Sequence, residues 1–101
     1  MSENHTEFDF LSDSTEQTTT RFVTFIGESM HRFDIAITAT DRFFGKHLVT
    51  DMQNGITAII GPDDLEEEGY LERCFKLSEE AGAELRSFLE QVIGPVHFTD
   101  T

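Results

Sequence analysis

The chain has 101 residues, of which 38% are hydrophobic and 11% aromatic, and its formal net charge is −13 at pH 7. This length allows one modest hydrophobic core, and the composition is that of a single globular domain rather than of a disordered chain. The negative charge disfavours binding to nucleic acid or to an anionic membrane surface, because like charges repel. It favours a basic protein partner.

The sequence predicts a cytoplasmic protein. Cys74 is the only cysteine, so no intrachain disulfide can form, and the first ten residues have neither the basic nor the apolar segment of a secretory signal. No apolar run approaches the roughly 20 residues that span a bilayer.

The charge is unevenly distributed along the chain. Residues 1–19 carry −5, residues 20–61 carry no net charge, and residues 62–90 carry −7. The central stretch therefore reads as an electrically balanced scaffold, with acidic segments on both sides of it.

The predicted domain organisation has three parts: a flexible acidic tail over 1–19, a single α+β domain over 20–94, and a C-terminal tail over 95–101. The first segment is rich in Ser, Thr, Glu and Asp and contains no Lys or Arg, a composition typical of flexible tails. Its only large apolar residues either dock on the domain or form a short motif for a partner: Phe8, Phe10 and Leu11.

Strand patterns begin at Arg21. The run Arg21–Ile26 is β-branched and aromatic on both faces, which predicts a strand covered on two sides or near the centre of a sheet. The run Arg32–Ala39 alternates cleanly, with Phe33, Ile35 and Ile37 on one face. Thr40–Gly45 breaks the alternation, so we expect a loop or bulge whose rings, Phe43 and Phe44, fold back onto the core.

A hairpin follows this loop. Two apolar runs, Lys46–Gln53 and Ile56–Ile60, flank Asn54-Gly55. Asn-Gly between such runs indicates a type I′ turn, because both of its central residues need positive φ. The two strands are therefore expected to be antiparallel neighbours.

The pattern then changes toward helices. Pro62–Glu68 predicts a short helical turn, capped by Asp63 or Asp64 and stopped at Gly69. Tyr70–Leu77 is ambiguous, and its alternation favours a fifth, edge-like strand over a helical continuation.

An amphipathic helix closes the domain. Ser78 is a good N-cap, and Ala81, Leu85, Phe88, Leu89 and Val92 recur at helical spacing up to Ile93. The fold class predicted is therefore α+β, an antiparallel sheet of four to five strands with one C-terminal amphipathic helix packed on a face. The predicted core consists of eleven residues: Phe22, Val23, Phe25, Phe33, Ile35, Ile37, Val49, Ile59, Leu85, Phe88 and Leu89.

The run Arg21–Ile93 resembles one family of short cytosolic proteins of unknown function from Gram-positive, Bacillus-type bacteria. The resemblance is carried by RFVTF, RFDIAITATDRFFGK, DMQNG, SEEAGAELRSFLEQVI and, most distinctively, GPDDLEEEGYLE at Gly61–Glu72. It implies a small α+β cytosolic protein, and it supplies no catalytic or ligand residues.

A metal site is one candidate for chemistry. His31, Asp34, His47 and Asp51 lie in or beside predicted strands, and imidazole and carboxylate are ligands that suit Zn²⁺ or Mn²⁺. Their spacing matches no zinc motif, so solvated polar side chains are the favoured interpretation, and we expect no bound metal.

Two further candidates have simpler interpretations. Cys74 has no neighbouring base or partnered motif, so a small buried side chain is favoured over a nucleophile. The acidic run lacks the alternating pattern of a calcium loop, so it is read as a solvated capping turn: Asp63, Asp64, Glu66, Glu67 and Glu68. No phosphate loop, HExxH or CxxC motif occurs, and we expect no cofactor.

Two functions remain open. In the first, the protein is a non-catalytic interaction module that contacts a partner through the acidic surface Asp63–Glu80. Its acidic turn, with Asp63, Asp64 and Glu66–Glu68, and the acidic face of the last helix meet a basic patch on another protein or on a second copy. In the second, it is a small enzyme or small-molecule binder, with a pocket between sheet and helix near Phe43-Phe44. Its polar chemistry would come from three side chains: His31, His47 and Cys74.

Overall fold

The computed structural model describes residues 7–93, which form one antiparallel sheet followed by three helices. The strands are β1 (Thr19–Ile26), β2 (Arg32–Ala39), β3 (His47–Asp51) and β4 (Ile56–Ile60). The helices are α1 (Pro62–Glu66), α2 (Tyr70–Phe75) and α3 (Glu79–Val92). The strand order is β1-β2-β3-β4, a simple meander. The predicted α+β fold, with its C-terminal helix on the sheet, is confirmed.

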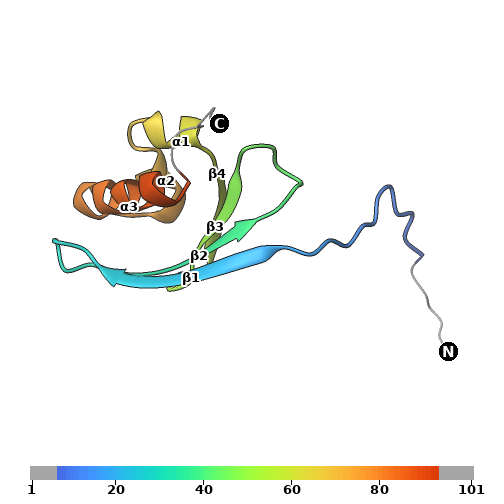
Figure 1. Ribbon diagram of the computed structural model, residues 1–101, viewed down its shortest axis with the longest axis horizontal. Helices are drawn as coiled ribbons and strands as arrows, with labels where there is room; N and C mark the ends of the chain where they lie inside the picture. The colour runs from blue at the N-terminus through green and yellow to red at the C-terminus, as the bar shows by residue number, and fades with distance from the viewer. Residues whose placement is uncertain (1–6, 94–101) are drawn as a thin grey trace, which may run out of the picture.

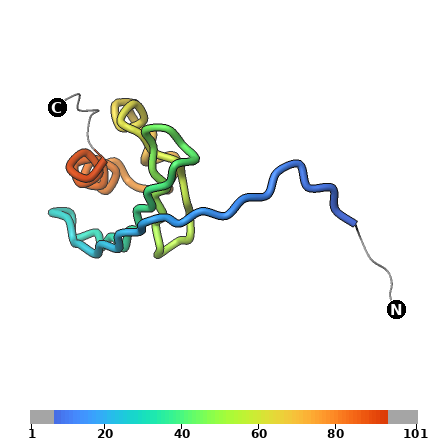
Figure 2. The backbone as a smooth tube through the Cα atoms, turned by 45° about the vertical axis from the view of Figure 1, so that its right-hand side comes forward, coloured from blue at the N-terminus to red at the C-terminus, as the bar shows by residue number. Residues whose placement is uncertain are grey.

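In the part of the chain that the structure describes, the sheet has one covered face and one bare face. All three helices lie on the same side of the strands, as Figure 1 shows, and the view in Figure 2 agrees. Residues on the covered, inner face follow from the cross-strand pairs, because directly opposed residues of an antiparallel ladder share a face. Thus Val23 pairs with Ile35, and Ile37 pairs with Val49, all on the inner face.

The hairpin between β3 and β4 is confirmed, but its turn is not type I′. Asp51 pairs with Ile56 across a four-residue loop, and the Gly55 N–H donates to the Asp51 carbonyl at 2.7 Å. Within this loop only Gly55 has a positive φ, of +78°, whereas a type I′ turn would also require a positive φ at Asn54. The longer loop needs only one left-handed residue, and it frees the Asn54 side chain to donate to the Phe75 carbonyl at 3.2 Å.

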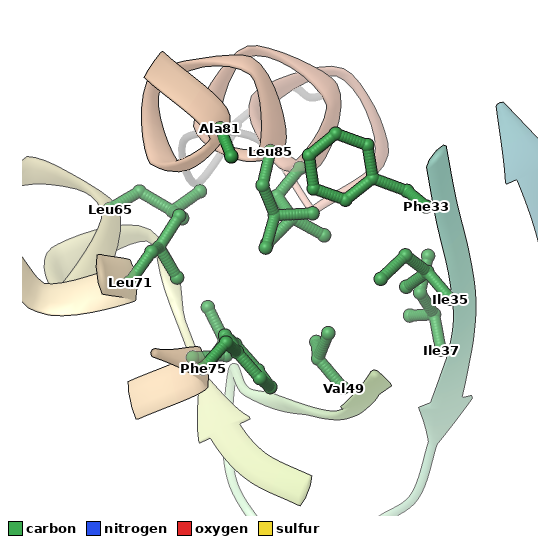
Figure 3. Close-up of a cluster of buried hydrophobic side chains, with 11 residues drawn as sticks. Phe33, Ile35, Ile37, Val49, Leu65, Leu71, Phe75, Ala81 and Leu85 are labelled. Atoms are coloured by element: carbon green, nitrogen blue, oxygen red, sulfur yellow. The ribbon is translucent and has the colours of Figure 1, made fainter. Parts of the chain in front are cut away.

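The core lies between the inner sheet face and the three helices (Figure 3). Leucines of α1 and α2 close it from one side, and α3 covers it from above. Its fully packed members come from every element except β1: Phe33, Ile35, Ile37, Val49, Ile60, Leu65, Leu71, Phe75, Ala81, Leu85 and Leu89.

Two residues of the predicted core are on the surface. Phe22 is 70% exposed and Ile59 is 38% exposed. Both lie on the bare outer face, since Phe22 pairs with Ala36 and Ile59 with Leu48, on the opposite side from the helices. The prediction that Arg21–Ile26 is central or doubly covered is therefore wrong, because β1 is an edge strand with one open face.

The expected return of Phe43 and Phe44 to the core is also wrong for the second ring. Phe44 is fully exposed in the loop between β2 and β3, and Phe43 is half-buried. Gly45, the residue after Phe44, has a left-handed backbone with φ of +71°.

Tyr70–Leu77 does not form a fifth strand, because residues Tyr70–Phe75 form helix α2. Leu71 and Phe75 are four residues apart, so they share a helical face and both enter the core. Arg73, which strand alternation puts beside them, is exposed. Lys76 ends the helix in the left-handed conformation, with φ of 58°.

The predicted helix caps at α1 and α3 are confirmed. The Asp64 carboxylate accepts from the Gly61 N–H at 2.8 Å, and Pro62 occupies the first position of α1. The Ser78 hydroxyl accepts from the Ala81 N–H at 3.1 Å at the start of α3. Both contacts satisfy backbone donors that a helix start leaves unpaired.

Residues 7–18 form an extended arm that leaves the domain at the start of β1 (Figure 1). Phe8, Phe10 and Leu11 are all exposed on it, so in this structure they do not dock on the domain. The arm is tethered near its base, where the Arg42 guanidinium donates to the Ser14 hydroxyl at 2.9 Å. The C-terminal tail predicted over 95–101 lies outside the described residues.

Candidate functional site

The acidic run divides into three groups with different surroundings. Asp64 is occupied, since it caps α1 and pairs with the Lys46 ammonium at 3.2 Å. Asp63 and Glu66 are exposed on α1. Glu67 and Glu68 follow in the turn before α2, where Glu67 pairs with the Arg73 guanidinium at 2.6 Å.

A groove of about 340 Å³ lies beside this turn, between the α1–α2 segment and α3. Its base contains the buried side chains of Leu65 and Leu71. Its rim carries four carboxylates and one guanidinium: Glu67, Glu68, Glu72, Glu90 and Arg86. We call this feature the acidic groove.

Tertiary packing brings these carboxylates together from separate elements. Glu72 comes from α2, and Glu90 comes from the last turns of α3, where it pairs with Arg86 at 3.1 Å. Glu67 and Glu68 are among the residues predicted from the sequence to bind a partner, and Glu72 lies within the acidic surface Asp63–Glu80 expected to contact it. Spacing along the chain does not relate Glu90 to Glu72, because the two residues lie on different helices, so only the fold reveals this grouping.

Gly82 of α3 makes room for one wall of the acidic groove. The Glu72 side chain lies against it, and a Cβ at position 82 would overlap the Glu72 carboxyl group. Any side chain there would push Glu72 into a new position. The glycine therefore lets α2 approach α3 while Glu72 stays at the groove.

Asp63, Asp64 and Glu66 do not line the acidic groove. The structure thus divides the five predicted partner-binding residues. Glu67 and Glu68 line the acidic groove, and Asp64 caps α1 and pairs with Lys46. Asp63 and Glu66 are exposed to solvent elsewhere on α1.

The four residues considered for a metal are not brought together. Asp34 is on the outer sheet face, where it accepts from the Thr24 hydroxyl at 2.6 Å and pairs with Arg32 at 3.3 Å. Asp51 is buried and accepts from the Gln53 N–H at 3.0 Å. Within residues 7–93, no three His, Cys, Asp or Glu side chains converge on a common point.

The two histidines have different neighbours. The His31 ring lies against Phe33, with 4.4 Å between the ring centroids. The Nδ1 atom of His47 is buried and has no hydrogen-bond partner among the described residues. Neither imidazole lines the acidic groove.

Cys74 is half-buried on α2, one helical turn from Tyr70. Hydrogen bonding with the Cys74 side chain raises the pKa of Tyr70 to about 12, and partial burial and the carboxylates of Asp64 and Glu67 act in the same direction. The phenol therefore stays neutral at physiological pH.

A second groove, of about 560 Å³, lies between β1 and α3. It is the sheet–helix pocket that the enzyme hypothesis requires, but His31, His47, Cys74, Phe43 and Phe44 are not among its lining residues. Its walls are Val23, Phe25, Gly27, Glu28, Ala83, Glu84, Ser87, Phe88 and Gln91.

The fold and its grooves define a small α+β protein with acidic helices on one face of a four-stranded sheet. The chain belongs to the SAV0927-like family, whose model matches residues 11–91. This is a family of small bacterial proteins of unknown function, as the resemblance implied. No curated protein matches the chain. Among the described residues, no helix is long and apolar enough to cross a membrane.

Proposed function

We propose that this protein is a non-catalytic interaction module that binds a basic segment of a protein partner in the acidic groove. The observation that carries the proposal is the combination of Leu65 and Leu71 at the base with four carboxylates on the rim. Such a groove suits arginine or lysine, whose methylene stems cover apolar surface while the charged tip meets a carboxylate.

The charge of the whole segment supports the same partner. Residues 62–90 carry −7, whereas the sheet region, residues 20–61, is neutral. A clustered negative field accelerates encounter with a positive partner and discriminates against acidic ones. The attraction weakens as the Debye length falls from about 10 Å at 0.1 M salt to about 3 Å at 1 M.

The setting of this function is part of the proposal. We place the protein in the cytoplasm of a Gram-positive bacterium, on the strength of the resemblance and of the single cysteine. The working unit is the α+β domain over 20–94, with residues 1–19 as an acidic tail.

Two pairs of substitutions test the acidic groove. Glu67→Gln with Glu68→Gln removes two charges that line it, and Asp63→Asn with Glu66→Gln removes two charges nearby that do not. Each purified variant is used to capture partners from an extract of the source bacterium, at low and at high salt. We expect the first pair to lose a basic protein that the second pair and the original sequence retain at low salt.

Other outcomes count against the proposal in different ways. Equal losses from both pairs would mean that general acidity, not the groove, attracts the partner. Retention by both pairs would mean that these carboxylates serve solubility alone. Circular dichroism of all variants must match that of the original, because exposed charges contribute little to stability.

A further inference from the structure

β1 has a free edge. It pairs with β2 along all eight residues, and among the described residues no strand pairs with its other side. The Gly27 N–H donates to the His31 carbonyl at 3.0 Å, so the backbone groups of Gly27 point toward the β2 side of the hairpin. Backbone groups of successive residues in a strand point to opposite edges. The N–H and C=O groups at the even positions of β1 therefore point away from β2: Thr20, Phe22, Thr24 and Ile26.

This edge lacks the features that usually prevent strands from pairing with other molecules. Within β1 there is no proline, lysine or glycine, and Arg21 is the only charged residue. Long edges of β-branched and aromatic residues act as templates for another strand unless a charge, proline or bulge blocks them.

Both faces beside this edge are apolar and incompletely covered. On the outer face, Phe22 is 70% exposed and Ile26 is 60% exposed. On the inner face, Val23 and Phe25 line the 560 Å³ groove beside α3, and the Phe25 ring contacts the Phe88 ring of α3 with 4.7 Å between centroids. A strand added to β1 would send side chains alternately to the two faces and would cover both.

Charge selects which strand fits. Glu28 and Glu84 stand at the end of the groove nearest the β1–β2 loop, and Glu84 is held there because it accepts from the Ser29 N–H at 2.6 Å. An acidic occupant, such as the arm segment that contains Glu7 and Asp9, would be repelled there. The sequence of β1 itself carries one positive charge and no negative one.

Antiparallel pairing of two β1 strands also places that positive charge well. Arg21 lies on the inner face, since it pairs with the buried Ile37. When two antiparallel copies are centred on Thr24, Arg21 of one copy lies opposite Gly27 of the other, beside Glu28. A two-fold contact repeats this match on both sides, because each copy offers the same surface.

We propose that two copies of this chain associate through antiparallel pairing of their β1 edges, so that the two four-stranded sheets become one continuous sheet. The two α3 helices then lie on the same face of that sheet. The whole chain carries −13, whereas β1 carries one positive charge and no negative one, so no carboxylates of the two β1 strands meet across this contact.

The test is the mass of the full chain in solution, measured by sedimentation equilibrium over a wide range of concentration. We expect the original sequence to reach twice its monomer mass of 11.5 kDa as concentration rises. Thr24→Pro removes an outward N–H and takes no backbone hydrogen bond from the ladder to β2, although it also removes the Thr24 hydroxyl that donates to Asp34. This variant should be a monomer at every concentration. Ile59→Lys, on the same outer face but on β4, should still dimerise.

Phe22→Lys is a second edge variant in case Thr24→Pro fails to fold, and it too should remain monomeric. A charge exchange tests the orientation: Arg21→Glu and Glu28→Arg should each weaken the dimer, and the double variant should restore it. The proposal is overturned if the original sequence stays monomeric throughout, or if folded Thr24→Pro and Phe22→Lys both dimerise as the original does.

Discussion

Two phenylalanines of opposite exposure give a direct test of where the core lies. Phe75, in α2, is 0% exposed, whereas Phe22, in β1, is 70% exposed. Replacing each by alanine removes the same atoms, so the difference in unfolding free energy reports mainly burial, because helix and strand propensities contribute at most about 1 kcal/mol. Sequence patterns predicted Phe22 in the core, did not include Phe75 there, and favoured an edge-like strand for the segment Tyr70–Leu77.

The expected magnitudes differ several-fold. Phe75→Ala leaves a cavity among core side chains and should cost about 3–5 kcal/mol, a large share of the roughly 5–15 kcal/mol that stabilises a small domain. Full burial of such a side chain is worth about 1.5–3 kcal/mol, and less than a third of Phe22 is covered, so Phe22→Ala should cost below about 1 kcal/mol.

Urea denaturation followed by far-ultraviolet circular dichroism measures both costs. With an m-value of roughly 2 kcal/mol/M, Phe75→Ala should lower the midpoint by roughly 2 M, and Phe22→Ala should lower it only slightly. The protein is kept dilute so that association does not add to its stability. Equal losses of unfolding free energy in the two variants would refute the burial of Phe75 between α2 and the sheet and the exposure of Phe22 on β1.

Three further outcomes are expected. Ultraviolet titration of Tyr70, the only tyrosine, should give a pKa of about 12 that falls toward 10 in Cys74→Ala. Because the pKa is higher in the folded state than in the unfolded state, the neutral phenol stabilises the fold below pH 10. This contribution is lost as the pH rises through 12. Glu84→Ala, which removes the acceptor for Ser29, should speed amide exchange in the β1–β2 loop and cost about 1 kcal/mol. Deleting residues 1–17 should leave strand amide protection intact, and its loss throughout the sheet would place the arm in the core.

Local patterns sufficed where a single element decides the outcome. The alternation of Arg32–Ala39 predicted β2, because only a half-buried strand repeats every two residues. Ser78 and the helical spacing after it predicted α3 and its cap. Asn54-Gly55 predicted the hairpin but not the turn type, which depends on where the strand pairing ends.

Long-range packing decided the rest. Leu71 and Phe75 fit a period of two and a period of four equally well, so their short segment could not be assigned from its pattern. The position of β1 at an edge depends on strand order, which the hydrophobicity of Phe22 does not encode. The acidic groove joins Glu72 to Glu90 across two helices, and no spacing along the chain indicates that pair.

The acidic groove is tested most directly by mapping a basic ligand onto the folded protein. A short peptide of alternating arginine and leucine is added at low salt to protein labelled with ¹⁵N, and amide shifts are followed to saturation. We expect shifts confined to residues 65–72 and 82–90, absent with a glutamate–leucine peptide and reduced in the Glu67→Gln, Glu68→Gln variant. Saturable shifts located elsewhere, or none at all, would contradict binding in the acidic groove.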